Sequence, residues 1–194
     1  HDAVHQDGAD VTFSSRAVLK SVLKLFDEAG LEPVIAPELE FFLVKQSSDA
    51  NAPLITPPGR SGRAEKARQA YGIDAVNEFD PLFEEIYDHC DVQGLDIDTL
   101  SHEAGAAQME INFNHGHALD LADQAFLFKR TVRQAAINHH LHATFMAKPM
   151  QEQPGSAMHV HVSVKSKKSG KNIFSNDDGS ESDDFYHSVA GMQR

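Results

Sequence analysis

The sequence predicts an α+β fold in which helices cover one face of a mostly antiparallel sheet. Segments with helical periodicity are interspersed with strand-like segments, in the order helix, strand, helix, strand, strand, helix, strand, strand. No internal repeat or linker separates them, which favours a single domain. Acidic and imidazole side chains interrupt several of the strand-like segments at alternate positions. Because residues two apart on a strand point to the same face, we expect the second face of the sheet to carry chemistry.

The helices are predicted from apolar residues that recur every three or four positions. Ser14 or Ser15 can cap the first helix, since a serine side chain accepts a hydrogen bond from a free backbone N–H of the first turn. Gly30 and Gly94 follow the first and second helices, where glycine commonly ends a helix. A further helix begins just before the C-terminus. The predicted ranges of the three longer helices are 15–29, 80–93 and 117–142.

The strands are predicted from short apolar runs bounded by turn-forming residues. Their ranges are 33–44, 95–100, 108–114, 143–147 and 157–164, with a short hairpin partner at 172–174. Residues 46–69 are rich in Ser, Pro, Gly and Arg and predict a long surface loop, and a loop of that length is usually functional or disordered. The acidic segment 176–184 is expected to be a solvated loop.

Composition excludes several classes of protein. A chain of 194 residues is long enough for one domain or for part of a larger one, and its net charge of −12 argues against binding nucleic acid. No apolar run is long enough to span a membrane. The one cysteine, Cys90, allows no internal disulfide, fits a cytoplasmic location and is expected to be a buried, inert thiol. Because the chain begins at His1 rather than Met, we expect it to be a piece of a longer protein.

Carboxylates interrupt two of the predicted strand regions. Glu38 and Glu40 share one strand face within PELEFFL, where a buried carboxylate is costly unless it is paired, hydrogen-bonded or metal-bound. The alternative is an edge strand with both acids in water. Glu103 and Glu110 are seven residues apart in HEAGAAQME, so a bend at 104–107 is needed to bring both to one site.

Imidazoles alternate with valines in the segment GSAMHVHVS. His159 and His161 point to the same face of the predicted strand, and neutral imidazole is a common metal ligand. The alternative is a pair of surface histidines on an edge strand. Gly155, just before the strand, would let a substrate approach the backbone closely. No phosphate-binding glycine loop and no Ser or Cys nucleophile motif occurs, so catalysis would depend on cations and positioning.

Four of these blocks together resemble the catalytic domain of the glutamine synthetase family. They occur in the family's order and spacing along nearly the whole chain, as PELEFFL, HEAGAAQMEI, ATFMAKP and PGSAMHVHVS. The resemblance implies that ATP phosphorylates the side-chain carboxylate of glutamate and that an amine then displaces the phosphate. It also implies two Mg²⁺ or Mn²⁺ ions in each active site of a cytoplasmic, ring-shaped homo-oligomer.

The resemblance also implies a role for each matching residue. Glu40, Glu103 and Glu110 would bind the cation nearer the glutamate and the amine, while Glu38 and His159 would bind the cation among the ATP phosphates. The remaining glutamate of that second set is expected beyond Arg194. His161 and Ser163 would contact the nucleotide, Asp98 and His115 would lie near it, and Gly155 would form part of the glutamate pocket.

One departure from the family pattern bears on the amine. Members that use ammonia usually have NGSGMH where this chain has PGSAMH, so Pro154 removes an amide side chain expected beside glutamate. The stretches YGIDAVNEFDPLFEEIYDHC and AAQMEINF look more like the γ-glutamylpolyamine synthetase branch, which joins glutamate to putrescine or a related amine. Ammonia remains the alternative.

The family resemblance implies that residues 1–194 form part of a single catalytic domain. The small N-terminal β-grasp domain and the C-terminal part of the catalytic domain are then absent, and this chain alone is expected to be inactive. Two other classes stay open: a metal- or nucleotide-binding module without catalysis, and an unrelated metal-dependent hydrolase. The second of these predicts hydrolysis with no requirement for ATP.

Overall fold

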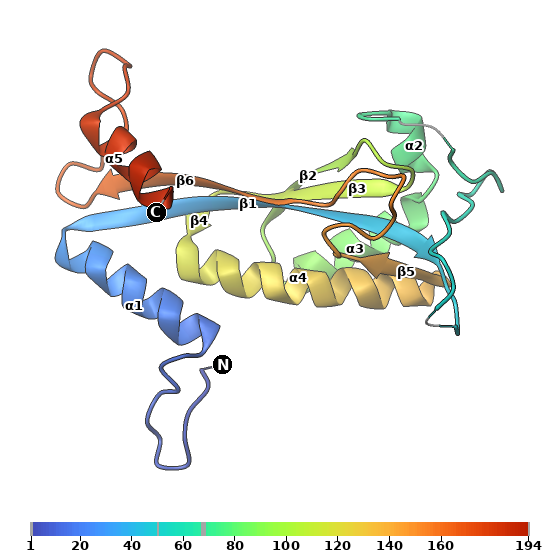
Figure 1. Cartoon of the computed structure of the whole chain (residues 1–194), viewed down its shortest axis with the longest axis horizontal. Helices are drawn as coiled ribbons and strands as arrows, with labels where there is room; N and C mark the ends of the chain where they lie inside the picture. Colours follow the sequence, from blue (N-terminus) through green and yellow to red (C-terminus); the bar gives the residue numbers. More distant parts are fainter. Residues whose placement is uncertain (1, 50, 67–68, 194) are drawn as a thin grey trace. The chain divides into compact units, whose positions relative to one another are not determined.

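A computed structural model describes residues 2–49, 51–66 and 69–193 of the chain (Figure 1). Its strands form a six-stranded sheet in the order β2-β3-β1-β4, with β5 and β6 also paired to β1. The pairs of β1 with β3, β4 and β5, and of β2 with β3, are antiparallel. The predicted α+β fold with an antiparallel sheet is therefore confirmed. The elements in order are α1 Ser15–Glu28, β1 Leu31–Lys45, α2 Ile73–Asn77, α3 Asp80–Gln93, β2 Ile97–His102, β3 Gln108–Phe113, β4 Gly116–His117, α4 Ala118–Asn138, β5 Leu141–Thr144, β6 Met158–Ser166 and α5 Asp183–Met192.

The contacts within the chain divide it into two compact units. One comprises residues up to Ile35, residues 115–120 and residues from His161 onward; the other comprises 36–114 and 121–160. All five predicted metal ligands belong to the second unit. None of the helices within the described ranges is both long and apolar enough to cross a membrane.

The core of the second unit lies between the sheet and the helices α3 and α4, which Figure 1 shows below β1 and β3 in that view. Phe128 of α4 is fully buried, and its ring meets Phe113 edge-on at a centroid distance of 5.3 Å. Phe145 stacks at an angle on Phe41, with 5.2 Å between centroids. The register pairs Phe41 with Met109, so both strands turn their odd-numbered apolar residues to this face. The even-numbered positions therefore point to the opposite face.

The first unit contains both ends of the chain. The Ser14 side chain accepts a hydrogen bond from the Ala17 N–H and caps α1, as predicted. The backbone N–H of Lys167 donates to Gly30 O at 2.9 Å, just after that helix ends. β4 pairs with the start of β1, with Val34 opposite His117. Ser182 caps α5 through the Phe185 N–H.

Several predicted boundaries are wrong in an informative way. The helix predicted to reach His142 ends at Asn138, and β5 starts at Leu141, because His140 takes a left-handed φ of 59° that ends the helix. The hairpin partner predicted at 172–174 is reduced to one bridge, between Lys165 and Asn172. The end of the acidic segment, predicted as loop, forms the first turn of α5. Acidic side chains are stabilised there by the helix dipole.

Candidate metal centre

Strand pairing brings the predicted carboxylates to one face of the sheet. In the antiparallel pair of β1 and β3, Glu40 lies directly opposite Glu110 and Glu38 lies opposite Asn112. Directly opposite residues of such a pair have Cβ atoms roughly 4.5–5.5 Å apart. Like charges in that arrangement destabilise a sheet unless something compensates for them.

The expected bend between Glu103 and Glu110 is present. β2 ends at His102 and β3 begins at Gln108, and the residues between them form a turn. Ala107 has a φ of 53°, a left-handed conformation that is unusual for alanine and must be held by its surroundings. Its N–H donates to Glu65 Oε2 at 2.7 Å, and its carbonyl accepts from Leu43 N–H at 2.9 Å.

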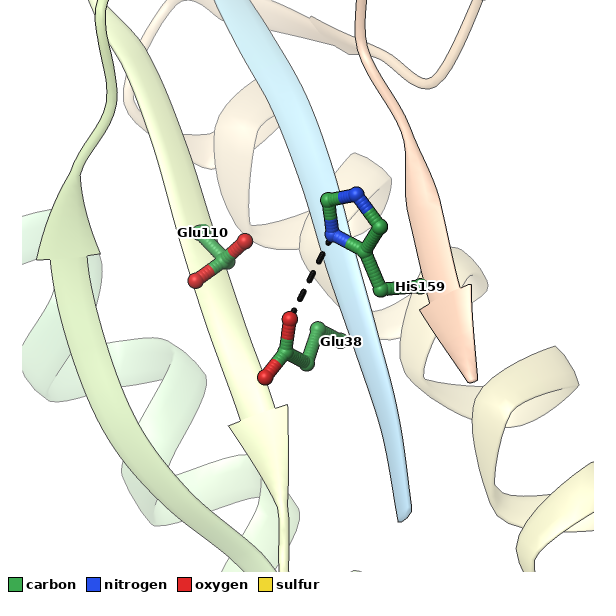
Figure 2. A group of neighbouring side chains, drawn as sticks. All are labelled: Glu38, Glu110 and His159. Atoms are coloured by element: carbon green, nitrogen blue, oxygen red, sulfur yellow. Dashed lines mark ion pairs between the residues drawn. The ribbon is translucent and has the colours of Figure 1, made fainter. Parts of the chain in front are cut away.

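His159, on β6, faces Glu38 and Glu110, as Figure 2 shows. Its Nδ1 lies 3.4 Å from Glu38 Oε2 and 3.9 Å from Glu40 Oε1. One potential ligand atom from each of Glu38, Glu110 and His159 lies within 4.8 Å of the other two. The structure therefore gathers ligands that the family resemblance divides between two cations. The division itself stays a prediction.

Four carboxyl groups lie close together on this face, and their proximity affects the pKa of Glu110. Burial, then the neighbouring charges of Glu103, Glu38 and Glu40, raise the pKa of Glu110 to about 7, while His159 acts in the opposite sense. Carboxylate oxygens are the ligands that hard divalent cations prefer. A cation would offset the charges of Glu103, Glu38 and Glu40, which add to the effect of burial on this pKa. The donor set fits Mg²⁺ or Mn²⁺ with imidazole as an added ligand.

A buried ion pair fixes the strand end beside Glu103. The His102 side chain is fully buried, its Nε2 lies 2.9 Å from Glu65 Oε2, and its Nδ1 lies 2.7 Å from Glu103 O. Burial lowers the pKa of His102, but the hydrogen bond and charge of Glu65, with Glu103, outweigh burial and raise it. A histidine that donates from both nitrogens is the charged form. Glu65 thus links the long loop, through His102, to the backbone carbonyl of the predicted ligand Glu103.

The segment around Gly155 packs tightly on the chain that follows β5. A Cβ added at Gly155 would lie 2.8 Å from the backbone oxygen of Ala147, too close for any other residue without a shift. The Ser156 N–H donates to that same oxygen at 2.9 Å. The Ala157 N–H donates to Glu40 Oε2 at 3.0 Å, beside a cavity of about 200 Å³. The predicted glutamate segment therefore contacts a predicted metal ligand directly.

Three of the four predicted nucleotide contacts lie outside the unit that contains the predicted ligands. His161, Ser163 and His115 belong to the other contact unit, so their roles stay predictions. Asp98 lies exposed on β2, where its backbone oxygen accepts a hydrogen bond from the Tyr87 hydroxyl at 3.3 Å. Its role beside a nucleotide also stays a prediction.

Three residues of this centre had no predicted role. Glu65 lies in the loop 46–69, which the sequence marked only as functional or disordered. His102 precedes Glu103 and looks like an ordinary strand residue. Gln108 shares the strand face of Glu110, and that alternation was the one local signal of its place. Two of its three side-chain hydrogen bonds are with residues far away in the sequence, Glu40 and Gly155.

Comparison with known proteins agrees with the geometry. Residues 12–194 match the family model described as glutamine synthetase, catalytic domain. The γ-glutamylputrescine synthetase PuuA of Escherichia coli is 37% identical over 192 residues, which is 97% of this chain and 40% of that protein. A glutamine synthetase of Halobacterium salinarum is 36% identical over 177 residues, 91% of this chain and 37% of its own length.

Solved structures share the fold. The cryo-electron microscopy structure of Plasmodium falciparum glutamine synthetase superimposes with a TM-score of 0.84 over 98% of this chain and 42% of that one, at 21% identity. The structure titled apo GmaS without ligand gives a TM-score of 0.74 at 29% identity, over 89% of this chain and 39% of that one. The chain thus spans about 40% of the length of the relatives it matches. With its family model matched from residue 12 to the last residue, the chain belongs to the glutamine synthetase catalytic-domain family.

Proposed function

We propose that the complete protein is an ATP-dependent ligase that joins the side-chain carboxylate of glutamate to an amine through γ-glutamyl phosphate. The observation that carries the proposal is the meeting of Glu38, Glu110 and His159 within 4.8 Å, on the sheet of a glutamine synthetase catalytic domain. Two more carboxylates complete the donor set. Glu40 lies directly opposite Glu110, and the charge of Glu103 helps to raise the pKa of Glu110.

The proposed cations are Mg²⁺ or Mn²⁺, two in each site. Glu40, Glu103 and Glu110 would hold one, and Glu38 with His159 would hold the other. When bound, the cations neutralise charge on the phosphoryl group during its transfer. The residues of the chain supply position and not a covalent nucleophile, in accord with the absence of a Ser or Cys nucleophile motif.

The substrate-binding roles follow from the family assignment. We expect ATP to lie against His161, Ser163, Asp98 and His115, and glutamate to lie against the segment that contains Gly155. Gly155 is exposed, and its close packing on Ala147 fixes the backbone that glutamate would approach. The complete protein is expected to work as a homo-oligomer, and the present chain alone is expected to lack ligase activity.

The amine is proposed to be putrescine or another polyamine. Two observations support this choice: the 37% identity to E. coli γ-glutamylputrescine synthetase, and Pro154 in place of the asparagine usual in ammonia-using members. Ammonia is the second candidate, because the Halobacterium salinarum glutamine synthetase is 36% identical, close to the same level.

A substrate screen of the complete protein separates these candidates. ADP release is measured with ATP, glutamate, Mg²⁺ and one of ammonia, putrescine, spermidine or ethanolamine. The proposal expects turnover that needs both ATP and glutamate and is fastest with a polyamine. Turnover with ammonia alone would overturn the polyamine assignment, and metal-dependent hydrolysis without ATP would overturn the ligase assignment. The same assay on the 194-residue chain is expected to give no turnover.

A further inference from the structure

Gln108 is a fully buried amide at the meeting point of three segments of the proposed site. Its side chain is 1% exposed. The Nε2 group donates one hydrogen bond to Glu40 Oε2 at 2.9 Å and a second to Gly155 O at 2.9 Å. The Oε1 atom accepts from the Gly105 N–H at 2.9 Å. Both amide hydrogens are therefore used, each on a different segment of the chain.

The orientation of this amide follows from its partners. Nε2 faces two acceptors, and Oε1 faces a backbone donor, so exchanging the two atoms would lose all three hydrogen bonds. The Gln108 amide can come this close to residue 105 only because that residue is glycine. A Cβ at Gly105 would lie 2.7 Å from Gln108 Oε1 and 2.6 Å from the ring of Phe42. Only glycine fits between the amide and the ring.

The backbone of Gln108 also stabilises the turn between β2 and β3. Its carbonyl accepts from the Glu103 N–H at 2.8 Å, and its N–H donates to Gly105 O at 3.1 Å. One residue therefore contacts the predicted ligand Glu40 through its side chain and the predicted ligand Glu103 through its main chain. It also contacts the predicted glutamate segment at Gly155.

The partners of Glu40 show what this contact does to the carboxylate. Oε2 accepts hydrogen bonds from Gln108 and from the Ala157 N–H, at 2.9 and 3.0 Å. Oε1 faces the other way, 3.9 Å from His159 Nδ1. Two donors on one oxygen lock the rotamer of the side chain and direct the second oxygen toward the imidazole. Groups that orient a ligand in this way typically change metal affinity by roughly 10–100-fold when removed.

We propose that Gln108 is a positioning residue that couples cation binding to glutamate binding. The inference rests on the proposed ligase function. One planar amide joins Glu40 to the carbonyl of Gly155, so a cation that draws Glu40 into its bound position also sets the position of the glutamate segment. Two sites coupled through a shared element raise each other's affinity by the same factor.

The test uses binding measurements on the complete protein, with Mn²⁺ and glutamate as probes and no turnover. Calorimetry gives the Kd of Mn²⁺, and the Kd of glutamate with and without Mn²⁺. In the natural protein, Mn²⁺ is expected to tighten glutamate binding about tenfold, within the usual range for coupled sites. In Gln108→Met, which keeps the size of the side chain but has no amide, Mn²⁺ binding is expected to weaken roughly 10–100-fold. The glutamate affinities with and without Mn²⁺ should then differ by less than about twofold.

Thr131→Val is the matched control. Thr131 is 6% exposed on α4 and exchanges hydrogen bonds with Gln93, so its loss removes a buried polar contact away from the proposed ligands. Gln108→Asn, which keeps an amide but shortens its reach, serves where Gln108→Met does not fold. It is expected to weaken both binding events by an intermediate factor, since one amide hydrogen bond at most can be kept.

The outcomes separate the inference from the proposed function. Loss of coupling in the Gln108 variants, with Thr131→Val unchanged, supports the positioning role. If the affinities and the coupling in the Gln108 variants equal those of Thr131→Val, the positioning role is overturned and the ligase proposal stands. A natural protein that binds no Mn²⁺ at all overturns the proposed function, and the inference with it.

Discussion

Glu110→Gln is expected to stabilise the metal-free protein while weakening its capacity for metal. Glu110 lies directly opposite Glu40, and burial together with three neighbouring carboxylates raises its pKa from the ordinary 4.5 to about 7. A glutamine has nearly the same shape and no charge. The substitution therefore removes the repulsion without opening a cavity in the sheet.

The pKa sets both the sign and the size of the effect. Between pH 4.5 and 7 the folded protein holds a proton that the unfolded chain has lost, so the free energy of unfolding falls as pH rises through that window. At ~1.36 kcal/mol for each pKa unit, the full effect is about 3 kcal/mol. Because Glu110 is only partly buried, solvent screening reduces it to about 1–2 kcal/mol.

Thermal unfolding of the complete protein in EDTA measures this effect. At pH 8 the variant is expected to unfold about 2–8 °C above the natural protein, and at pH 4.5 the two should unfold together. Excess Mn²⁺ should reverse the order at pH 8, because the natural protein retains the ligand, binds Mn²⁺ more tightly and is stabilised more. Glu84→Gln, on the exposed side of α3, is the control and should change nothing. A variant that is less stable in EDTA at pH 8, or equally stabilised by Mn²⁺, would refute this reasoning.

Three further predictions concern single side chains, two at the site and one on α3. Gly155→Ala should raise the KM for glutamate about 10–100-fold in the complete protein and the KM for ATP much less, because its Cβ would lie 2.8 Å from Ala147 O and displace the segment; equal rises in both constants would contradict this. Burial raises the pKa of Cys90 to about 11, so at pH 8 iodoacetamide should label the native thiol roughly a thousandfold more slowly than a free thiolate, and rapid native labelling would disprove it. Glu65→Ala should lower the free energy of unfolding by about 3 kcal/mol, since it leaves the buried His102 Nε2 and the Ala107 N–H without their shared acceptor; a loss below about 0.5 kcal/mol in chemical denaturation would be inconsistent with a buried ion pair.

The parts of the site that follow a local pattern could be predicted from the sequence. Alternation alone put Glu38 and Glu40 on one strand face, and the short stretch between Glu103 and Glu110 required the bend that is present. The ends of α1 and α3 were predicted within a residue, because a serine cap and glycines mark them. In each case the signal lies within a few residues of the feature.

The rest depends on contacts between distant residues. The opposition of Glu40 and Glu110 is a matter of strand register, and no pattern within either strand fixes which residues face each other across the pair. Gln108 lies 68 residues from Glu40, and His102 lies 37 residues from Glu65. The early end of α4, at Asn138, has no glycine to signal it, and the left-handed residue that follows is His140, so the local sequence predicts a longer helix.

Equilibrium titration of Mn²⁺ into the complete, metal-free protein tests the central claim most directly, with free Mn²⁺ counted by its electron paramagnetic resonance signal. We predict saturable binding of two ions for each chain, lost when Glu38→Gln and Glu110→Gln are combined and kept in Glu84→Gln. Binding that does not saturate, or that survives the double substitution unchanged, would contradict the assignment of this carboxylate face as a metal centre.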